Sequence, residues 1–248
     1  MASCAGDAHE SPRRSPAQDV RENVDGLLVD IAPDALAAAR ESGVDLAGTV
    51  RSAIQLASGL LGDVRTDLSV VVDPERTIAG IGVGGYTDPN TGDVTISLDD
   101  APGRRIATWL PVTVAYELDH VARVNHGPGF GSTLLEVMVT EGMADAFATQ
   151  AYPAAPAHPW AEALPAAADS VGPGQPSLDE LQDLHGYAKV VPGEARLPAW
   201  TGFSIGSGIV SSYLARHPEE RASDLVTVSA QEVLRGSGWM ATTGPPTG

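Results

Sequence analysis

The segment from Pro111 to Ala148 holds the residues of this chain with the clearest capacity for chemistry. Within it, Tyr116, Glu117 and His120 follow the spacing of the motif H-E-x-x-H, with a tyrosine in place of the first histidine. Residues four positions apart lie on one face of a helix, so in that motif two imidazoles hold one divalent metal ion. The glutamate beside the first histidine takes a proton from water. The spacing therefore predicts His120 as a metal ligand and Glu117 as a general base.

Two acidic residues farther along the chain extend this predicted site. Glu141 follows His120 at a distance that allows a Gly-Pro-Gly turn and a second, antiparallel helix. In one large class of zinc hydrolases the third ligand is a glutamate on that following helix, and we expect Glu141 in this role. Asp145 lies one helical turn beyond Glu141, on the same face. A carboxylate there can hydrogen-bond a metal ligand and fix its orientation.

The tyrosine at position 116 leaves the metal chemistry open. A neutral phenol is a poor zinc ligand, because its unperturbed pKa is about 10. A bound metal can lower that pKa, and a hard ferric ion favours phenolate more than zinc does. Tyr116 could therefore be a metal ligand, a catalytic phenol, or a packing residue in a weakened site. A catalytic zinc usually has three protein ligands, so the ligand count alone does not decide between these alternatives.

The motifs around this site are similar to those of one known family. The carrying segments are Tyr116–His120, Gly127–Leu135, Thr140–Asp145 and Leu197–Gly206. In them the chain resembles the predicted zinc-dependent proteases, a family with gluzincin-like active sites that is often described only as a domain of unknown function. The resemblance covers roughly residues 25 to 238 in the order of elements. It implies a zinc cofactor, a water nucleophile and hydrolysis of peptide bonds.

The resemblance also implies residues that contact the substrate. Gluzincin-type sites have a catalytic histidine downstream of the third ligand, which makes His185 a candidate, and His126 near the turn after the first helix is a second one. Phe203 stands where the family tends to show a tyrosine, so a hydroxyl that would hold a tetrahedral intermediate is missing. Gly82 and Val83 lie on the strand expected to pair with an extended peptide.

Composition limits the partners. The net charge of −17, from 15 basic and 32 acidic residues, argues against nucleic acid and against an anionic membrane. A single cysteine, Cys4, precludes a disulfide within the chain. No apolar run approaches the length of a membrane span, and the N-terminus lacks the apolar core of a secretory signal. We expect a soluble, cytoplasmic protein whose partner is a peptide or a small molecule.

The hydrophobic pattern predicts an α+β fold, mostly helical and zincin-like (gluzincin-type), with a small antiparallel sheet packed beside the two active-site helices. Residues 21–62 are expected to be helical, residues 68–99 to form the strands, and residues 219–235 to form the last helix. The domain is expected over residues 21–238, between a disordered tail at 1–20 and a flexible tail at 239–248.

The segment after the second metal helix is rich in alanine and proline. It could be a lid over the cleft or a surface excursion, and His158 within it is expected to face solvent. A capping box at Ser177 predicts a further helix that runs toward Tyr187.

Two further motifs imitate nucleotide and serine-hydrolase sites. The glycines at 80, 82 and 85 spell G-x-G-x-x-G, but a turn and a strand follow, where a dinucleotide site needs a helix. Gly202 to Gly206 spells G-x-S-x-G, but the residues before it make a poor strand. We expect neither chemistry.

Two functions of different classes remain. The first is a zinc hydrolase of the peptidase type, with water activated by Glu117. The second is a repurposed or lapsed peptidase fold that binds or transforms a small molecule, with Glu117 and Tyr116 as a metal-free acid/base pair.

Overall fold

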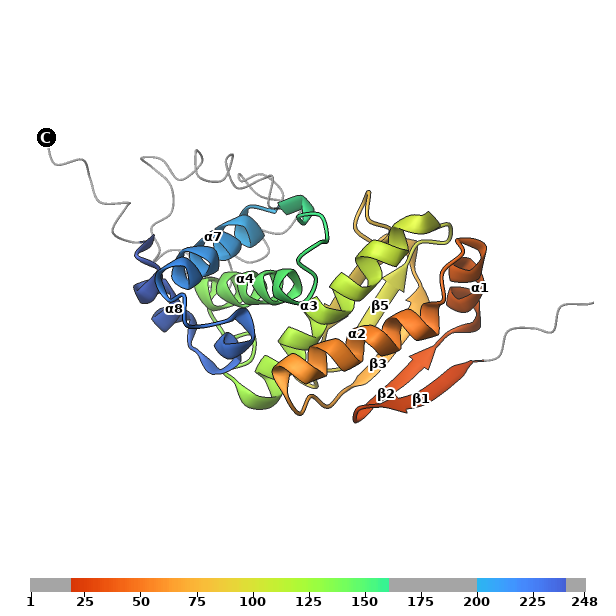
Figure 1. Ribbon diagram of the computed structural model, residues 1–248, viewed down its shortest axis with the longest axis horizontal. Coiled ribbons are helices and arrows are strands. Elements are labelled where there is room, and N and C mark those ends of the chain that lie inside the picture. Colours follow the sequence, from red (N-terminus) through yellow and green to blue (C-terminus); the bar gives the residue numbers. More distant parts are fainter. Residues whose placement is uncertain (1–18, 161–199, 240–248) are drawn as a thin grey trace, which may run out of the picture.

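The computed structural model describes residues 19–160 and 200–239. Figure 1 shows a sheet with α2 and α3 lying across it, while α4, α7 and α8 gather at the other end of the molecule. The strands are β1 Val20–Val24, β2 Leu27–Ile31, β3 Asp67–Val72, β4 Val83–Thr87 and β5 Val94–Leu98. The α-helices are α1 Pro33–Glu41, α2 Leu46–Leu61, α3 Ile106–His126, α4 Leu134–Ala151, α7 Thr201–Arg216 and α8 Ala230–Ser237. The 3₁₀ helices within the described residues are η1 Pro74–Arg76, η2 Gly103–Arg105 and η5 Ala222–Thr227.

The predicted α+β class is confirmed, but the sheet is mixed and not wholly antiparallel. Its strand order is β1-β2-β3-β5-β4, with antiparallel pairs at both ends and parallel pairs β2–β3 and β3–β5 in the middle. The chain passes from β2 to β3 through α1 and α2, and such helical crossovers return the next strand in the same direction. The strand β4 lies at the edge of the sheet, on the side nearest α3.

The expectation that residues 21–62 are helical is wrong for their first part, which forms the hairpin β1–β2. Asp25 and Gly26 connect the strands with φ angles of 49° and 92°, as primed two-residue turns require. In β2, Leu27, Val29 and Ile31 alternate inward and are fully buried. The Asp-Gly turn and the alternation of buried residues favour a hairpin here, and the helical pattern begins only after Ile31.

The residues at the ends of α3 and α4 determine where these two central helices begin. The helix α3 begins at Ile106, five residues before Pro111, and most of its residues are buried because both sides are covered. The helix α4 begins with a capping box in which the Thr133 hydroxyl accepts from the Glu136 N–H and the Glu136 carboxylate accepts from the Thr133 N–H. The turn between them contains the expected Gly-Pro-Gly, so the predicted antiparallel pair is present.

The helices α4 and α7 pack with their backbones in contact. A β-carbon at Gly142 would overlap the backbone of Gly206, and one at Gly206 would overlap the carbonyl of Met138. Within α7, Ser204 is fully buried and donates to the carbonyl of Trp160 at 2.6 Å. The G-x-S-x-G motif is therefore a packing motif inside a helix, and its hydroxyl is already used.

Several expectations fall on other parts of the chain. The helix predicted from Ser177 to Tyr187, the candidate His185 and most of both tails lie outside the described residues. The helix expected over 219–235 is divided into η5 and α8, because Ser229 begins α8 as an N-cap. Among the residues that the structure describes, no helix has the length and apolarity to cross a membrane.

Candidate active site

Tyr116, Glu117 and His120 of α3 and Glu141 of α4 line one cavity of about 500 Å³. The edge strand β4 forms another wall through residues 84–87, and Phe130 lies in the turn between the helices. Such a volume is in the range that accommodates small ligands and short peptides. The antiparallel helix pair therefore brings the predicted residues to a common, accessible space.

His120 and Glu141 are placed as two ligands of one metal ion would be. Their Nε2 and Oε2 atoms are 3.3 Å apart, and both side chains are nearly buried. Two ligands of a tetrahedral zinc, each bound at its usual length, would be separated by about 3.4 Å. Burial alone would lower the pKa of His120, but the negative charges of Glu141, Glu117 and Asp119 raise it above its ordinary value. The donors and their spacing fit zinc.

The His120 ring is held by packing. It lies 4.6 Å from the Phe130 ring and 5.1 Å from the Tyr116 ring, between centroids. Its second nitrogen, Nδ1, is buried and has no hydrogen-bond partner among the described residues. Metal-ligating histidines usually fix their second nitrogen by a hydrogen bond, so in this site aromatic neighbours take over part of that orienting function.

Tyr116 contacts the metal-ligand position as a hydrogen-bond donor. Its hydroxyl donates to Glu141 Oε2 at 2.6 Å, the same oxygen that faces His120. Burial, followed by the charge of Glu141, raises the pKa of Tyr116 well above its ordinary value. The phenol is therefore held neutral, and it donates a hydrogen bond to the carboxylate that is predicted to bind the metal. Of the three predicted metal donors, two fit zinc as they stand and Tyr116 fits only after losing its proton.

Glu117 is a buried carboxylate between α3 and the edge strand. Its Oε2 accepts a hydrogen bond from Thr87 of β4 at 2.7 Å. Burial raises its pKa to about 7, although the positive charge of His120 and the Thr87 hydrogen bond oppose that shift. Gly85 leaves the space that Glu117 occupies, since a β-carbon there would overlap the carboxylate. A carboxyl group with a pKa near neutrality is suited to proton transfer in both directions.

Asp145 and His158 form a pair that the sequence reasoning did not anticipate. Asp145 Oδ1 lies 2.5 Å from His158 Nδ1, and its Oδ2 accepts from Ser207 at 2.8 Å. Asp145 therefore supports His158 and not a metal ligand. His158 is buried and lines the cavity, contrary to the expected exposure, because its ring stacks on Trp160 at 4.4 Å. The one signal in the sequence is the aromatic residue two positions after the histidine.

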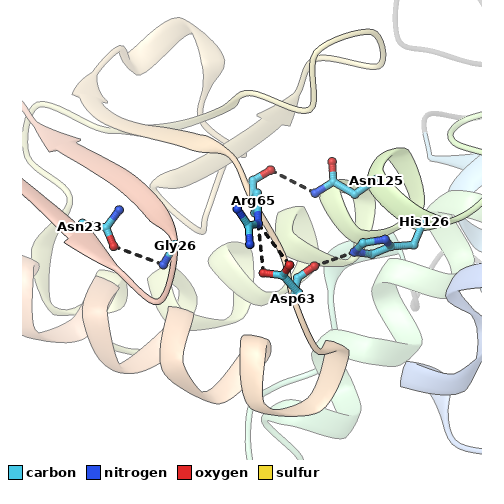
Figure 2. A network of polar contacts seen from close by, with 6 residues as sticks. All are labelled: Asn23, Gly26, Asp63, Arg65, Asn125 and His126. Atoms are coloured by element: carbon cyan, nitrogen blue, oxygen red, sulfur yellow. Dashed lines mark hydrogen bonds and ion pairs between the residues drawn. The ribbon is translucent and has the colours of Figure 1, made fainter.

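Other predicted substrate contacts lie elsewhere or at the edge of the cavity. His126 is exposed at the end of α3, where its Nε2 donates to the carbonyl of Asp63 at 2.6 Å (Figure 2). Figure 2 also shows Asn125 beside it, which donates to the carbonyl of Arg65 at 3.0 Å. These contacts attach the end of α3 to the segment that follows α2, and His126 does not line the cavity. His126 therefore lies apart from the other candidate residues, and its role in substrate binding stays a prediction.

The two residues predicted to contact substrate near β4, Gly82 and Val83, lie one or two residues before the part of the strand that lines the cavity. Val83 is fully buried in the core and Gly82 lies beside Pro102, while the lining of the cavity begins at Gly84. Phe203 of α7 lines the cavity.

Behind the site, α3 buries a second group of charges. Arg123 is almost fully buried, and its guanidinium donates to the carbonyls of Leu225, Val226 and Val228, which attaches η5 to α3. The Asp119 carboxylate is buried without a hydrogen-bond partner among the described residues, and burial raises its pKa to about 6. The helix that presents Glu117 and His120 is thus fixed from its rear face by polar contacts.

Fold and site together define a class: an α+β protein whose paired helices carry a variant H-E-x-x-H site beside an edge strand. The family model described as Predicted Zn-dependent protease (DUF2268) matches residues 49–235, and the chain belongs to this family. The matched range contains all the candidate residues named above, so the resemblance drawn from the motifs is confirmed at the level of the family. Neither a curated protein nor a solved structure matches the chain.

Proposed function

We propose that the protein is a zinc-dependent peptidase in which His120 and Glu141 hold the metal and Glu117 activates water. The observation that carries this proposal is the approach of His120 Nε2 and Glu141 Oε2 to 3.3 Å in a cavity that also contains the buried Glu117. Membership of a family named for zinc-dependent proteolysis supports the same conclusion.

A zinc ion held there would supply a Lewis acid that makes water more acidic and polarises a carbonyl group. Glu117 takes a proton from water and passes it to the leaving amine, and its pKa of about 7 suits both transfers. The edge strand β4 offers backbone donors and acceptors to an extended peptide, which would place its scissile bond beside Glu117.

Two further side chains have roles in this proposal. The Tyr116 hydroxyl holds the Glu141 carboxylate in place by donating to Oε2. His158 keeps its Nδ1 on Asp145, so that its Nε2 is left to contact a substrate in the cavity that His158 lines. This is the position that the resemblance assigned to a histidine downstream of the third ligand, and His158 takes it in our proposal.

The test measures bound zinc in the purified protein at neutral pH, and cleavage of a mixed peptide library by mass spectrometry. A surface group formed by His217, Glu219 and Glu220 could also hold an ion, so both measurements use a Glu219→Gln/Glu220→Gln background. We expect one zinc per chain, lost in His120→Ala and in Glu141→Ala. Glu117→Gln should retain zinc and lose cleavage. Absence of zinc from the parent protein would refute the proposal.

A metal-free acid/base site for a small molecule is the second candidate. The 2.6 Å hydrogen bond from Tyr116 to Glu141 favours it, because it holds a neutral phenol, a possible proton donor, in the cavity that Glu117 also lines. An activity that survives a strong chelator and is lost in both Glu117→Gln and Tyr116→Phe would select this candidate. Under the zinc proposal, the chelator abolishes activity and Tyr116→Phe weakens it.

A further inference from the structure

Three aromatic rings form one wall of the cavity. Trp160, Trp200 and Phe203 lie mutually 5.3 to 5.4 Å apart between centroids, and all three line the cavity. Distances of this kind are typical of interacting aromatic pairs. Trp200 and Phe203 are only partly buried, so their rings retain surface that faces the open space. We refer to these three residues as the aromatic wall.

The aromatic wall adjoins the reactive groups. The Trp160 ring lies 5.9 Å from the Tyr116 ring, whose hydroxyl is hydrogen-bonded to Glu141, and it stacks on His158. The Tyr116 ring therefore lies between the wall and Glu141, the predicted metal ligand. A group that rests on it would be the side chain nearest to the bond under attack.

The backbone at Trp200 is held in an unfavourable conformation. Its φ angle is 70°, in the left-handed region that bulky residues rarely adopt. The residue precedes α7, and its carbonyl accepts the N–H of Ser204 at 2.9 Å. A glycine would satisfy that backbone at lower cost, so the indole is kept for a reason other than local folding. Strain of this kind is concentrated at functional sites.

The wall has no charged members. Among the residues that the structure describes, the charged groups that line the cavity are Glu117 and Glu141 at the reactive end and Arg76 on the η1 side, apart from the two histidines. A glutamate side chain placed against the wall would lose hydration without gaining a partner. An aromatic side chain would bury its area there and gain ring contacts as well.

From these observations we infer that the site takes peptides with an aromatic side chain next to the cleaved bond, bound against the aromatic wall. The inference rests on the proposed function, and it names the substrate class of that site. Because β4 and the wall line the same cavity, an extended peptide paired with β4 would bring one of its side chains within reach of the wall.

The test compares blocked peptides that differ at one position, phenylalanine, alanine, lysine or glutamate. Binding is measured by calorimetry on the full-length Glu117→Gln protein loaded with zinc, so that cleavage does not interfere. We expect the phenylalanine peptide to bind on the order of tenfold more tightly than the alanine peptide, and the glutamate peptide more weakly still. Cleavage by the parent protein should follow the same order in kcat/KM.

The decisive variant is Trp200→Gly in the same background. It removes the ring and suits the φ of 70°, so loss of folding is not expected to obscure the result. The phenylalanine preference should fall to about twofold or less, because the phenylalanine peptide loses more affinity than the alanine peptide. Leu56→Ala, which removes an exposed apolar side chain far along α2, is the matched control and should leave the preference intact.

The outcomes separate this inference from the proposed function. Peptide cleavage that depends on Glu117 but shows no aromatic preference would overturn the inference and leave the hydrolase intact. An aromatic preference that is unchanged in Trp200→Gly would also overturn it. Aromatic binding that depends on Trp200, in a parent protein that cleaves nothing, would refute the hydrolase and retain the wall as a binding site.

Discussion

Two regions of the molecule bury very different side chains. The first region is the sheet with α1 and α2, and the second consists of α3, α4 and His158, which follows them. In the first region the buried residues are almost all apolar, and the polar exceptions are Thr87 and Ser97 of the strands. In the second region the buried residues include every acidic, basic or histidine side chain that is buried in the described part of the chain. These are Glu117, Asp119, His120, Arg123, Glu141 and His158.

The difference shows where stability comes from and where it is lost. Burial of apolar surface stabilises the fold, whereas burial of charge opposes it unless the charge is paired. The helix α3 belongs to both regions, since Leu110, Val114 and Leu118 pack in the apolar core while Glu117 and His120 face the cavity. The apolar face of α3 thus offsets the cost of its reactive face.

The largest expected effect lies in the charged region and concerns activity. Glu117→Gln preserves the shape of the side chain and removes its ability to accept a proton. We expect kcat/KM for peptide cleavage to fall by about 10³-fold, as for the loss of a general base. Measured zinc content should stay at the parental value. Full activity in this variant would remove Glu117 from the mechanism.

The next prediction concerns the apolar region. Ile96→Ala truncates a fully buried side chain in the central strand β5 and should lower the free energy of unfolding by about 2–5 kcal/mol. Denaturant unfolding measures this change. Zinc content per folded chain should be unaffected. If Ile96→Ala lost zinc at temperatures where it is folded, the metal site would depend on the apolar region, contrary to the comparison above.

A third prediction concerns pH and the stability of the metal-free protein. The pKa of Glu117 is raised by burial from 4.5 to about 7, so its ionisation disfavours the folded state. Its contribution is fully favourable below pH 4.5 and is lost as pH rises through 7. Metal-free Glu117→Gln should therefore be more stable than the parent at pH 8, by at most about 3 kcal/mol, and equally stable near pH 4. Equal stability at both pH values would contradict the burial of this charge.

The smallest effect concerns the start of α4. Thr133→Ala removes a capping hydroxyl and should cost about 1 kcal/mol in unfolding experiments at pH 7. Hydrogen bonds from Ser132 and Thr133 lower the pKa of Glu136, so its part of the cap is present above the ordinary carboxyl pKa and lost in acid. The difference between Thr133→Ala and the parent should shrink toward pH 3. A constant difference would mean that the cap acts without Glu136.

The sequence reasoning located the reactive helices because helical spacing is local. Residues 116, 117 and 120 share a face whatever surrounds them, and the turn before Thr133 leaves one arrangement for Glu141. The hairpin at residues 20–31 was missed although its Asp-Gly turn is also a local signal. There the alanine-rich pattern of the following helix was extended too far.

Contacts between segments far apart in the chain could not be predicted in this way. Asp145 contacts His158 and Ser207, and Glu117 contacts Thr87. Each of these pairs depends on how helices, a loop and an edge strand approach one another in three dimensions. The same holds for the aromatic wall, whose members are separated by some forty residues of chain.

The glycine contact between α4 and α7 has a consequence for how this protein can diverge. Gly142 directly follows Glu141, so the position of that carboxylate relative to α7 is set by backbone touching backbone at Gly206. A larger residue at one of these positions has no smaller residue opposite it to make room. We therefore expect relatives with this helix pair to keep both glycines together, or to lose the acidic residue before the first one as well.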